Sequence, residues 1–298
     1  MRELLQGQRS VKFRNKRGPL VSRGTRFPFQ IAVACWADLL GYGAMIAEAD
    51  FNPLHPKASE ALRRLRRFHE IVASHSSRNF PTLVMNDGAV AYRDLSLRSR
   101  APTHDFLMRA WNLFNSIKND EKARGFPGAR VVLATGFRML GRRGGIDATA
   151  SHFKSVMHRY QNKDISAEQA IREAANIQQS FDVIPRLQAN FAFAKAYVAE
   201  SSGTKGGLGG ARFFVDLSLF ETPTPAWVTK EETVEWVNEA LRMRVSFAPI
   251  LELPAFTQAE IQVAGGTRGI RDGLQIAEHL TQDPNVLIAL RTAQKPPK

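Results

Sequence analysis

The sequence contains almost no cysteine: Cys35 is the single one among 298 residues, so a disulfide within the chain is impossible. Cys35 lies in the apolar run 31–36, where a buried reduced thiol is more typical than a reactive one. The sequence also lacks a cleavable signal segment and an apolar run long enough to span a membrane. We therefore expect a cytoplasmic protein that folds without covalent cross-links.

Zinc motifs and common phosphate-binding motifs are missing as well. The seven histidines show no paired ligand spacing on one helix face and have no cysteine companions, which argues against zinc. The glycine-rich segment 203–210 has the spacing of neither a P-loop nor a dinucleotide-binding turn. We predict a loop between a helix and a strand there, which could still cover a substrate.

Acidic residues are few relative to basic ones, with 28 Asp and Glu against 41 Lys and Arg and a net charge of +13. Residues 1–26 carry eight of the bases, one acid and no helical or strand periodicity. This pattern is typical of a flexible solvated tail, with contact to nucleic acid or a membrane as the alternative. We expect no stable partner of either kind. A further basic run, expected on the solvated side of a helix, comprises Arg63, Arg64, Arg66 and Arg67.

The periodicity of residues 27–135 predicts the element order strand, helix, strand, strand, helix, strand. A buried strand is expected at 27–37, a helix through 62–72, a hairpin of strands 82–85 and 89–92, a helix at 103–121 and a strand at 129–135. This βαββαβ order is that of a ferredoxin-like α+β fold.

The rest of the sequence is divided by glycine- and proline-rich breaks. Residues 141–180 are predicted to be a helical insertion or arm within a catalytic domain spanning 27–220, and 221–298 a C-terminal extension packing on the core. The predicted elements after the insertion are helix 186–201, strand 211–216, helix 231–242, strand 245–251, helix 270–280 and strand 286–290.

Asp38 and Asp87 are the strongest candidates for chemistry. Asp38 ends the first predicted strand, and Asp87 lies at the hairpin turn Asn86-Asp87-Gly88. In a βαββ unit the first strand usually lies beside the hairpin, which would bring the two carboxylates together. Such carboxylates can hold the divalent ions of a triphosphate site. Alternatively, Asp38 merely ends a strand, and Asp87 is present because aspartate favours a tight turn.

Four segments in order resemble motifs of class III nucleotidyl cyclases. Residues 37–42 (Ala-Asp-Leu-Leu-Gly-Tyr) resemble the first metal motif, and residues 85–92 (Met-Asn-Asp-Gly-Ala-Val-Ala-Tyr) resemble the second, in a hairpin. Residues 129–136 are similar to the strand leading into a glycine, and residues 188–200 to the helix that carries transition-state groups. The similarity covers about residues 27–220. The insertion and the closing strand 211–216 are most similar to the pyrimidine cyclases of the bacterial Pycsar antiphage systems.

The resemblance implies a class III cyclase core, active as a homodimer with its sites between two catalytic domains. It also implies two Mn²⁺ or Mg²⁺ ions held by Asp38 and Asp87, with the backbone carbonyl of Leu39 as a further ligand. The backbone amides of Leu40, Gly41, Tyr42 and Gly43 would lie near the substrate phosphates.

One position departs from the family pattern. Asn190 matches the asparagine that the family places over the reacting phosphate, but Ala194 stands where the family has an arginine. Lys195 is adjacent and could supply the missing positive charge only imperfectly, because it lacks the planar fork of arginine. Arg130 and Arg138 are the other candidates.

The activity implied by the resemblance is the conversion of UTP, or CTP, to a 3′,5′-cyclic nucleotide plus pyrophosphate, with the product activating a partner effector. Tyr42 could narrow the base pocket in favour of a pyrimidine, although a core aromatic explains it equally well. Two alternatives remain open. One is a basic nucleic-acid-binding module with residues 1–26 as its arm, and the other is a silent relative that senses nucleotide, suggested by Ala194.

Overall fold

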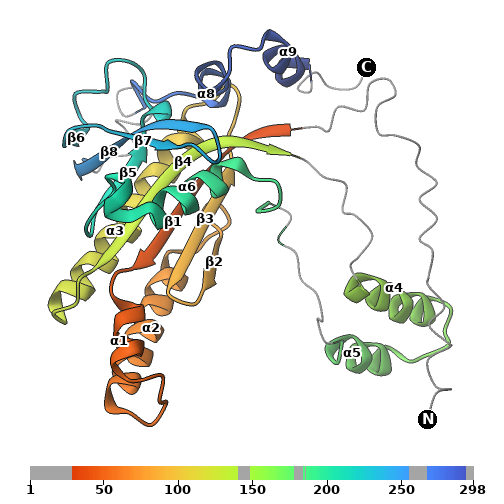
Figure 1. Ribbon diagram of the computed structural model, residues 1–298. Helices are drawn as coiled ribbons and strands as arrows, with labels where there is room; N and C mark the ends of the chain where they lie inside the picture. Colours follow the sequence, from red (N-terminus) through yellow and green to blue (C-terminus); the bar gives the residue numbers. More distant parts are fainter. Residues whose placement is uncertain (1–28, 140–147, 178–183, 185, 255–266, 293–298) are drawn as a thin grey trace, which may run out of the picture.

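The computed structural model describes residues 29–139, 148–177, 184, 186–254 and 267–292 (Figure 1). The basic segment 1–26 lies outside the described residues. None of the described helices combines the length and the apolarity needed to traverse a lipid bilayer.

The predicted βαββαβ order is confirmed, with one short extra helix after the first strand. The strands follow the spatial order β2-β3-β1-β4, which is the ferredoxin-like arrangement. The mixed α+β fold is therefore as predicted. The elements of this core are β1 (Phe29–Leu39), α1 (Tyr42–Glu48), α2 (Pro56–His75), β2 (Thr82–Met85), β3 (Gly88–Asp94), α3 (Ala101–Ala123) and β4 (Ala129–Met139).

The sheet continues beyond the ferredoxin-like core into the C-terminal half of the chain. Next to β4 lies β5 in parallel, followed by the antiparallel β8, which pairs on its other side with both β6 and β7. Residues beyond 220 thus extend the same sheet that begins with β1. The added strands are β5 (Phe213–Asp216), β6 (Thr229–Lys230), β7 (Val234–Asn238) and β8 (Met243–Glu252).

Strand β1 is buried on both faces, as its apolar sequence predicts. Its odd-numbered residues, including Cys35, join the core under α2 and α3, and its even-numbered residues join the core under α6 (Phe191–Ser202). Figure 1 shows α6 crossing one face of the sheet over β1 and β4, with α3 behind it. The thiol of Cys35 is 1% exposed, and burial raises its pKa. It is therefore a core residue, as expected.

Helix α6 lies unusually close to the sheet because small residues face it. Ala192, Ala196 and Ala199 are fully buried against the sheet. A Cβ placed on Gly136 of β4 would lie 2.5 Å from the backbone nitrogen of Ala192. Only glycine at 136 permits this approach, which sets the height of α6 above the strands.

The expectation that Arg64 is a solvated member of the α2 basic run is wrong. Arg64 is 2% exposed, and its Nη2 lies 2.5 Å from Oε2 of Glu121 on α3. The same nitrogen donates to the carbonyl of Leu40 at 2.8 Å. A buried arginine needs such partners, because an unpaired buried charge is costly. Arg64 thereby ties α2, α3 and the β1–α1 loop together.

The predicted insertion contains two helices, α4 (Ala148–Gln161) and α5 (Ala167–Ala175). They pack on each other through a small apolar cluster of Val156, Ile165 and Ala170, which is separate from the clusters of the sheet.

Two predictions for the C-terminal part are wrong. The helix expected at 231–242 is β7, in which Trp236 is 1% exposed while its neighbours Glu235 and Val237 face solvent. This alternation is the period of a strand. The strand expected at 286–290 is helix α9 (Pro284–Thr292). The helix expected at 270–280 is found as α8 (Gly273–Leu280).

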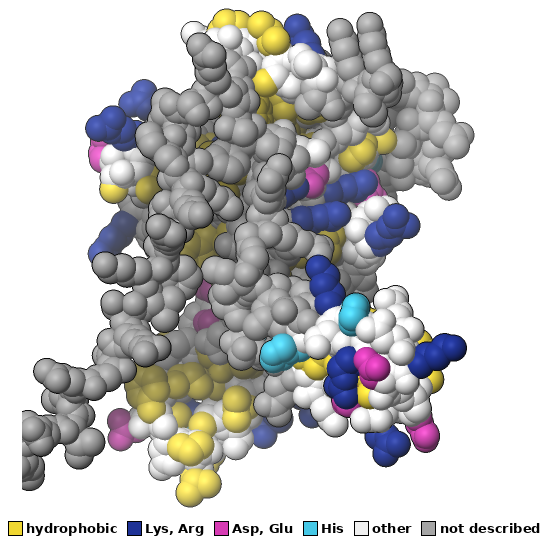
Figure 2. All heavy atoms as spheres, turned by 90° about the vertical axis from the view of Figure 1, so that its right-hand side faces the viewer, with side chains coloured by type: hydrophobic (Ala, Val, Ile, Leu, Met, Phe, Trp, Pro, Cys, Tyr) yellow, Lys and Arg dark blue, Asp and Glu magenta, His cyan; other side chains and the backbone are white. Residues whose placement is uncertain are grey.

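Lys and Arg side chains occupy several separate places on the face shown in Figure 2, and some have acidic side chains beside them. Several are ion-paired, for example Arg67 with Asp120 at 2.9 Å and Arg159 with Glu173 at 2.7 Å. The positive charge of the described surface is therefore partly neutralised within the molecule.

Candidate active site

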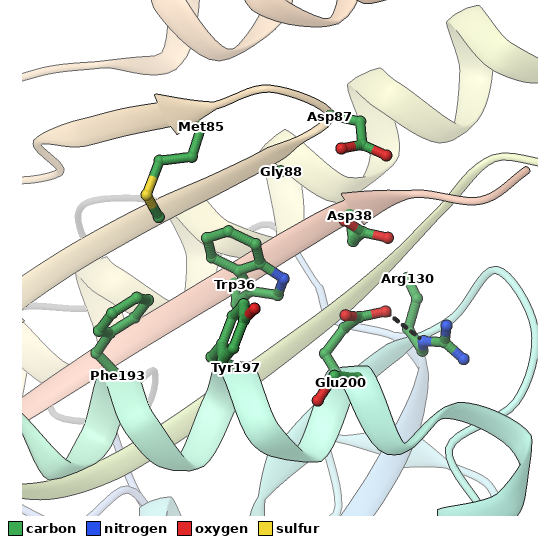
Figure 3. A pocket seen from close by; sticks show the side chains of 10 residues that line it. Trp36, Asp38, Met85, Asp87, Gly88, Arg130, Phe193, Tyr197 and Glu200 are labelled. Atoms are coloured by element: carbon green, nitrogen blue, oxygen red, sulfur yellow. Dashed lines mark hydrogen bonds and ion pairs between the residues drawn. The ribbon is translucent and has the colours of Figure 1, made fainter. Parts of the chain in front are cut away.

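A pocket of about 670 Å³ lies where the ends of β1, β3 and β4 meet helix α6. Its floor comes from the strands and one wall from the helix (Figure 3). The lining residues are Trp36, Asp38, Met85, Asp87, Gly88 and Arg130 from the sheet side, and Phe193, Tyr197, Glu200 and Ser201 from α6.

The structure brings Asp38 and Asp87 to this one pocket, as predicted. In the antiparallel β1–β3 pair, Asp38 lies opposite Gly88, and the Leu39 amide donates to the Asp87 carbonyl at 3.0 Å. Asp87 occupies the two-residue hairpin turn after Asn86, whose φ of 54° is left-handed. Asparagine tolerates this conformation better than most residues. Figure 3 shows both carboxylates at the same end of the pocket.

Negative charge accumulates around Asp38. Burial, then Glu200, then Asp87 raise the pKa of Asp38 from 3.8 to about 7, with Arg130 acting in the opposite direction. Carboxylates that line one pocket disfavour the ionisation of one another unless a cation joins them. This donor set fits a divalent ion.

The protein ligands for such an ion are few. Within the residues that the structure describes, no group of three or more His, Cys, Asp or Glu side chains is arranged to hold a metal ion. Mg²⁺ sites that use one or two carboxylates complete their coordination with substrate phosphates and water. Asp38 and Asp87 match that pattern, and the carbonyl of Leu39 remains a predicted further ligand.

Arg130 is the cation of the pocket. It lies opposite Asp38 in the β1–β4 pair, on the same face of the sheet. Its Nε donates to Oε1 of Glu200 at 2.8 Å, and its Nη1 donates to the carbonyl of Leu208 at 2.8 Å. The guanidinium is thus held in place beside the two aspartates.

The opposite part of the pocket is aromatic. The rings of Trp36 and Tyr197 meet edge to face with centroids 5.1 Å apart, and Phe193 lies 6.0 Å from Trp36. A Cβ on Gly88 would fall 2.3 Å from the Trp36 ring, so glycine is needed for the indole to lie over the β3 strand. Tyr197 remains 47% exposed, which leaves an aromatic surface available to a planar ligand.

Three predicted polar residues are not brought to the pocket. Asn190 caps α6, accepting from the amide of Phe193 at 3.0 Å. Lys195 is buried in an ion pair with Asp216 at 2.9 Å. Arg138 donates two hydrogen bonds of 2.7 Å to Asp94, near the other end of β4. Since Lys195 and Arg138 have partners elsewhere, we do not include them in the candidate site.

The predicted phosphate loop also lies outside the lining residues. The Leu40 amide already donates to the carbonyl of Gly128 at 3.0 Å, and Gly41 precedes α1 with φ 77°. Gly43 lies in α1. Tyr42 belongs to the core on the α2 side, where burial and then Asp87 raise its pKa. Its ring therefore does not narrow the pocket described here.

Sequence reasoning missed the α6 wall of the pocket. Phe193, Tyr197 and Glu200 follow a helical spacing of four and three residues, and this signal was available in the sequence. The sequence could not reveal their contact with Trp36 and Arg130, because this contact depends on how α6 docks across the sheet.

No protein-family model and no curated protein matches this sequence. Among solved structures, the chain is similar to the guanylyl cyclase Cya2, at 11% identity and a TM-score of 0.45, covering 77% of this chain and 96% of that one. It is similar to the guanylate cyclase domain of RhGC from Catenaria anguillulae in complex with GTP, at 8% identity and a TM-score of 0.40, covering 76% and 98%. A bacterial light-regulated adenylyl cyclase gives 10% identity and a TM-score of 0.42, covering 80% and 58%. Likeness at these identities and TM-scores does not assign an activity to this chain.

Proposed function

We propose that this chain is a metal-dependent nucleotidyl cyclase, which converts a nucleoside triphosphate into its 3′,5′-cyclic nucleotide and pyrophosphate. The observation that carries the proposal is the convergence of Asp38 and Asp87, from adjacent strands, on one pocket that also contains Arg130. The motif resemblance around residues 37–42 and 85–92 points to the same activity.

The two ends of the pocket suit the two ends of a nucleotide. The carboxylates and Arg130 form a polar end that fits a metal-bound triphosphate. Trp36, Phe193 and Tyr197 form an aromatic end on which a base can stack. A nucleoside triphosphate carries both features in one molecule.

In the proposed reaction the ribose 3′-oxygen attacks the α-phosphorus. The O3′–P bond forms, the bond to the β-phosphate oxygen breaks with pyrophosphate leaving, and the hydroxyl proton passes to solvent. Bound divalent ions would supply Lewis acidity at the α-phosphate. Asp38 and Asp87 would hold those ions, Arg130 would bind phosphate oxygens, and the aromatic wall would orient the base and exclude water.

UTP or CTP is the proposed substrate, on the strength of the resemblance to pyrimidine cyclases. With it we propose a homodimer with active sites at its interface and a role in antiphage defence, in which the cyclic product activates an effector. The exposed aromatic surface of α6, where Phe191 is 49% and Tyr197 47% exposed, is compatible with a partner subunit.

The test is to incubate the purified chain with each of the four ribonucleoside triphosphates and Mn²⁺, and to separate the products by chromatography. We expect a cyclic pyrimidine nucleotide and pyrophosphate in equal amounts. Asp38→Asn and Asp87→Asn should each reduce turnover by at least about a hundredfold, because each removes a charged ligand.

A matched control is Asp50→Asn, an exposed aspartate outside the pocket with φ 51°, which asparagine also adopts. Its turnover should equal that of the wild type. Unchanged turnover in both pocket variants would reject the metal assignment. A cyclic purine product would support cyclase activity but reject the pyrimidine assignment.

A nucleotide sensor without turnover is the second candidate. The described α6 residues lining the pocket are Phe193, Tyr197, Glu200 and Ser201, which include no lysine or arginine. A single chain therefore offers Arg130 as the one cation lining the described pocket. Saturable triphosphate binding with no cyclic product, at any protein concentration, would favour the sensor.

A further inference from the structure

The glycine-rich segment 203–210 forms a compact turn directly after α6. It begins as the short 3₁₀ helix Gly203–Gly206 and closes through a hydrogen bond from the Leu208 amide to the Gly203 carbonyl, at 2.9 Å. The Leu208 side chain is fully buried in the α6-side core. The turn is therefore anchored rather than open.

This turn encloses the side chain of Arg130. The Leu208 carbonyl accepts from Arg130 Nη1 at 2.8 Å. A Cβ on Gly203 would lie 3.2 Å from the same Nη1, so the absence of a side chain at 203 makes room for the guanidinium. Glu200, in the last turn of α6, completes the enclosure through its 2.8 Å bond from Arg130 Nε.

The enclosure fixes the guanidinium of Arg130 but leaves its Nη2 group available to a ligand. The Arg130 side chain is 12% exposed and that of Glu200 is 6% exposed, so their ion pair is shielded from water. Among the described residues, no partner accepts a hydrogen bond from Nη2 of Arg130. A guanidinium held this way presents the remaining donors in a fixed plane, which lowers the entropy lost when an oxyanion binds.

We propose that Glu200 and the turn 203–210 form a clamp that positions Arg130 to bind the phosphate groups of the triphosphate. This inference rests on the proposed function, because it assigns Arg130 to the triphosphate of that same site. Glu200 and Gly203 are positioning residues: they act through Arg130.

The clamp makes a prediction opposite to that of simple electrostatics. Glu200 is an anion facing a site for a polyanion, so its charge alone should weaken triphosphate binding. If its role is to hold Arg130, Glu200→Ala weakens binding although a negative charge has been removed. Glu200→Gln keeps an oxygen that accepts from Nε and retains most of the binding.

The experiment measures binding of inorganic tripolyphosphate with Mn²⁺ by calorimetry, and KM and kcat with the substrate triphosphate, on the full chain. We expect Glu200→Ala to raise the dissociation constant and KM about tenfold, the size of a lost charged hydrogen bond. Glu200→Gln should change them less than about threefold. Arg130→Lys should behave like Glu200→Ala, because lysine lacks the fork.

Gly203→Ala tests the role of the turn without removing or adding a charged group. Both Gly203 (φ 53°, ψ −141°) and Gly210 (φ 77°) have a positive φ that disfavours alanine, but a Cβ on Gly210 has no neighbour closer than 3.9 Å, from the Nε of Arg212. Gly210→Ala therefore also places alanine at a positive φ in this turn, without approaching Arg130. Gly203→Ala should raise KM about tenfold while Gly210→Ala leaves it near the wild-type value, with both variants checked by thermal unfolding.

The outcomes separate the clamp from the cyclase. Tighter or unchanged tripolyphosphate binding by Glu200→Ala, or equal effects of the two glycine variants, overturns the clamp even if cyclic product forms. Weaker binding by Glu200→Ala, with binding kept by Glu200→Gln, supports the clamp even if no triphosphate is cyclised.

Discussion

Asp38 has an environment unlike that of a surface carboxylate, because burial, Glu200 and Asp87 raise its pKa. Its pKa of about 7 means that the folded chain keeps a proton on Asp38 at pH values where the unfolded chain, with a pKa of 3.8, has lost it. Folding stability from this group is therefore present below about pH 4 and lost as the pH rises through about 7. The site is destabilised at neutral pH by the same charges that would attract cations.

Asp38→Asn should accordingly raise stability at alkaline pH. We expect about 2 kcal/mol at pH 8, since water in the pocket screens part of the about 4 kcal/mol that the full shift implies. The gain should vanish below about pH 4, where both states of the wild type are protonated. Urea denaturation at a series of pH values measures it, in metal-free buffer. A constant difference across that range contradicts the raised pKa.

At the scale of elements, the fit of α6 onto the sheet decides whether the pocket exists. The helix supplies the wall residues Phe193, Tyr197 and Glu200, and its closeness to the strands depends on Gly136. A methyl group there meets the backbone of Ala192, which cannot turn away as a side chain can.

Gly136→Ala is predicted to destabilise the chain by about 2–3 kcal/mol and to weaken triphosphate binding, because α6 must move outward. Gly43→Ala is the control: Gly43 lies in α1 with nothing within 4 Å of the added Cβ, so the change should leave stability equal or slightly higher. Thermal unfolding and tripolyphosphate titration report the two effects. Wild-type stability in Gly136→Ala would show that α6 can accommodate the added methyl group, and would contradict the close packing of α6 on β4.

Elements with strong local patterns could be predicted from the sequence. The buried β1, the β2–β3 hairpin, α2 and α3 all appear where their periodicity placed them. The predictions failed at β7, where pairing with β8 overrides the helical pattern of 231–242, and at α9, where a short apolar run fits either a helix or a strand. Arg64 shows the same limit within α2, because its partner Glu121 lies on α3.

In the candidate site, too, residues set by local features could be predicted, whereas residues set by tertiary contacts could not. Asp38 and Asp87 could be found because a strand end and a hairpin turn are local features, and strand pairing then brings them together. Lys195 was one candidate for the missing positive charge, but the sequence does not reveal that Asp216 pairs with it in the core. Glu200 was missed because its partner Arg130 comes from another layer of the fold.

At the scale of the whole molecule, the sheet does not end with the ferredoxin-like core. Strand β5 lies between β4 and β8, so removing the C-terminal segment would leave β5 as an unpaired edge. The apolar core under α2 and α3 also includes Ile250, Ile270 and Ile276 from that segment. The described parts of 221–254 and 267–292 are thus built into the main body.

A chain ending at residue 220 is predicted to lose cooperative unfolding, because Phe213 and Val215 of β5 would lose the cover given by β8. Circular dichroism during heating measures this. A chain ending at 292, which keeps every described element, is the control and should unfold as the full chain does. A sharp transition at the native temperature in the shorter chain would make 221–298 an accessory segment.

The sequestered sulfur of Cys35, at the centre of β1, has a practical consequence for studying motion in this protein. With the chain's single native thiol out of reach of maleimide reagents, a cysteine introduced at exposed Ser201 beside the pocket, or at Leu54, which is 90% exposed, would be the sole labelling position. Fluorophores or spin labels could then follow α6 or the α1–α2 connection in an otherwise wild-type background.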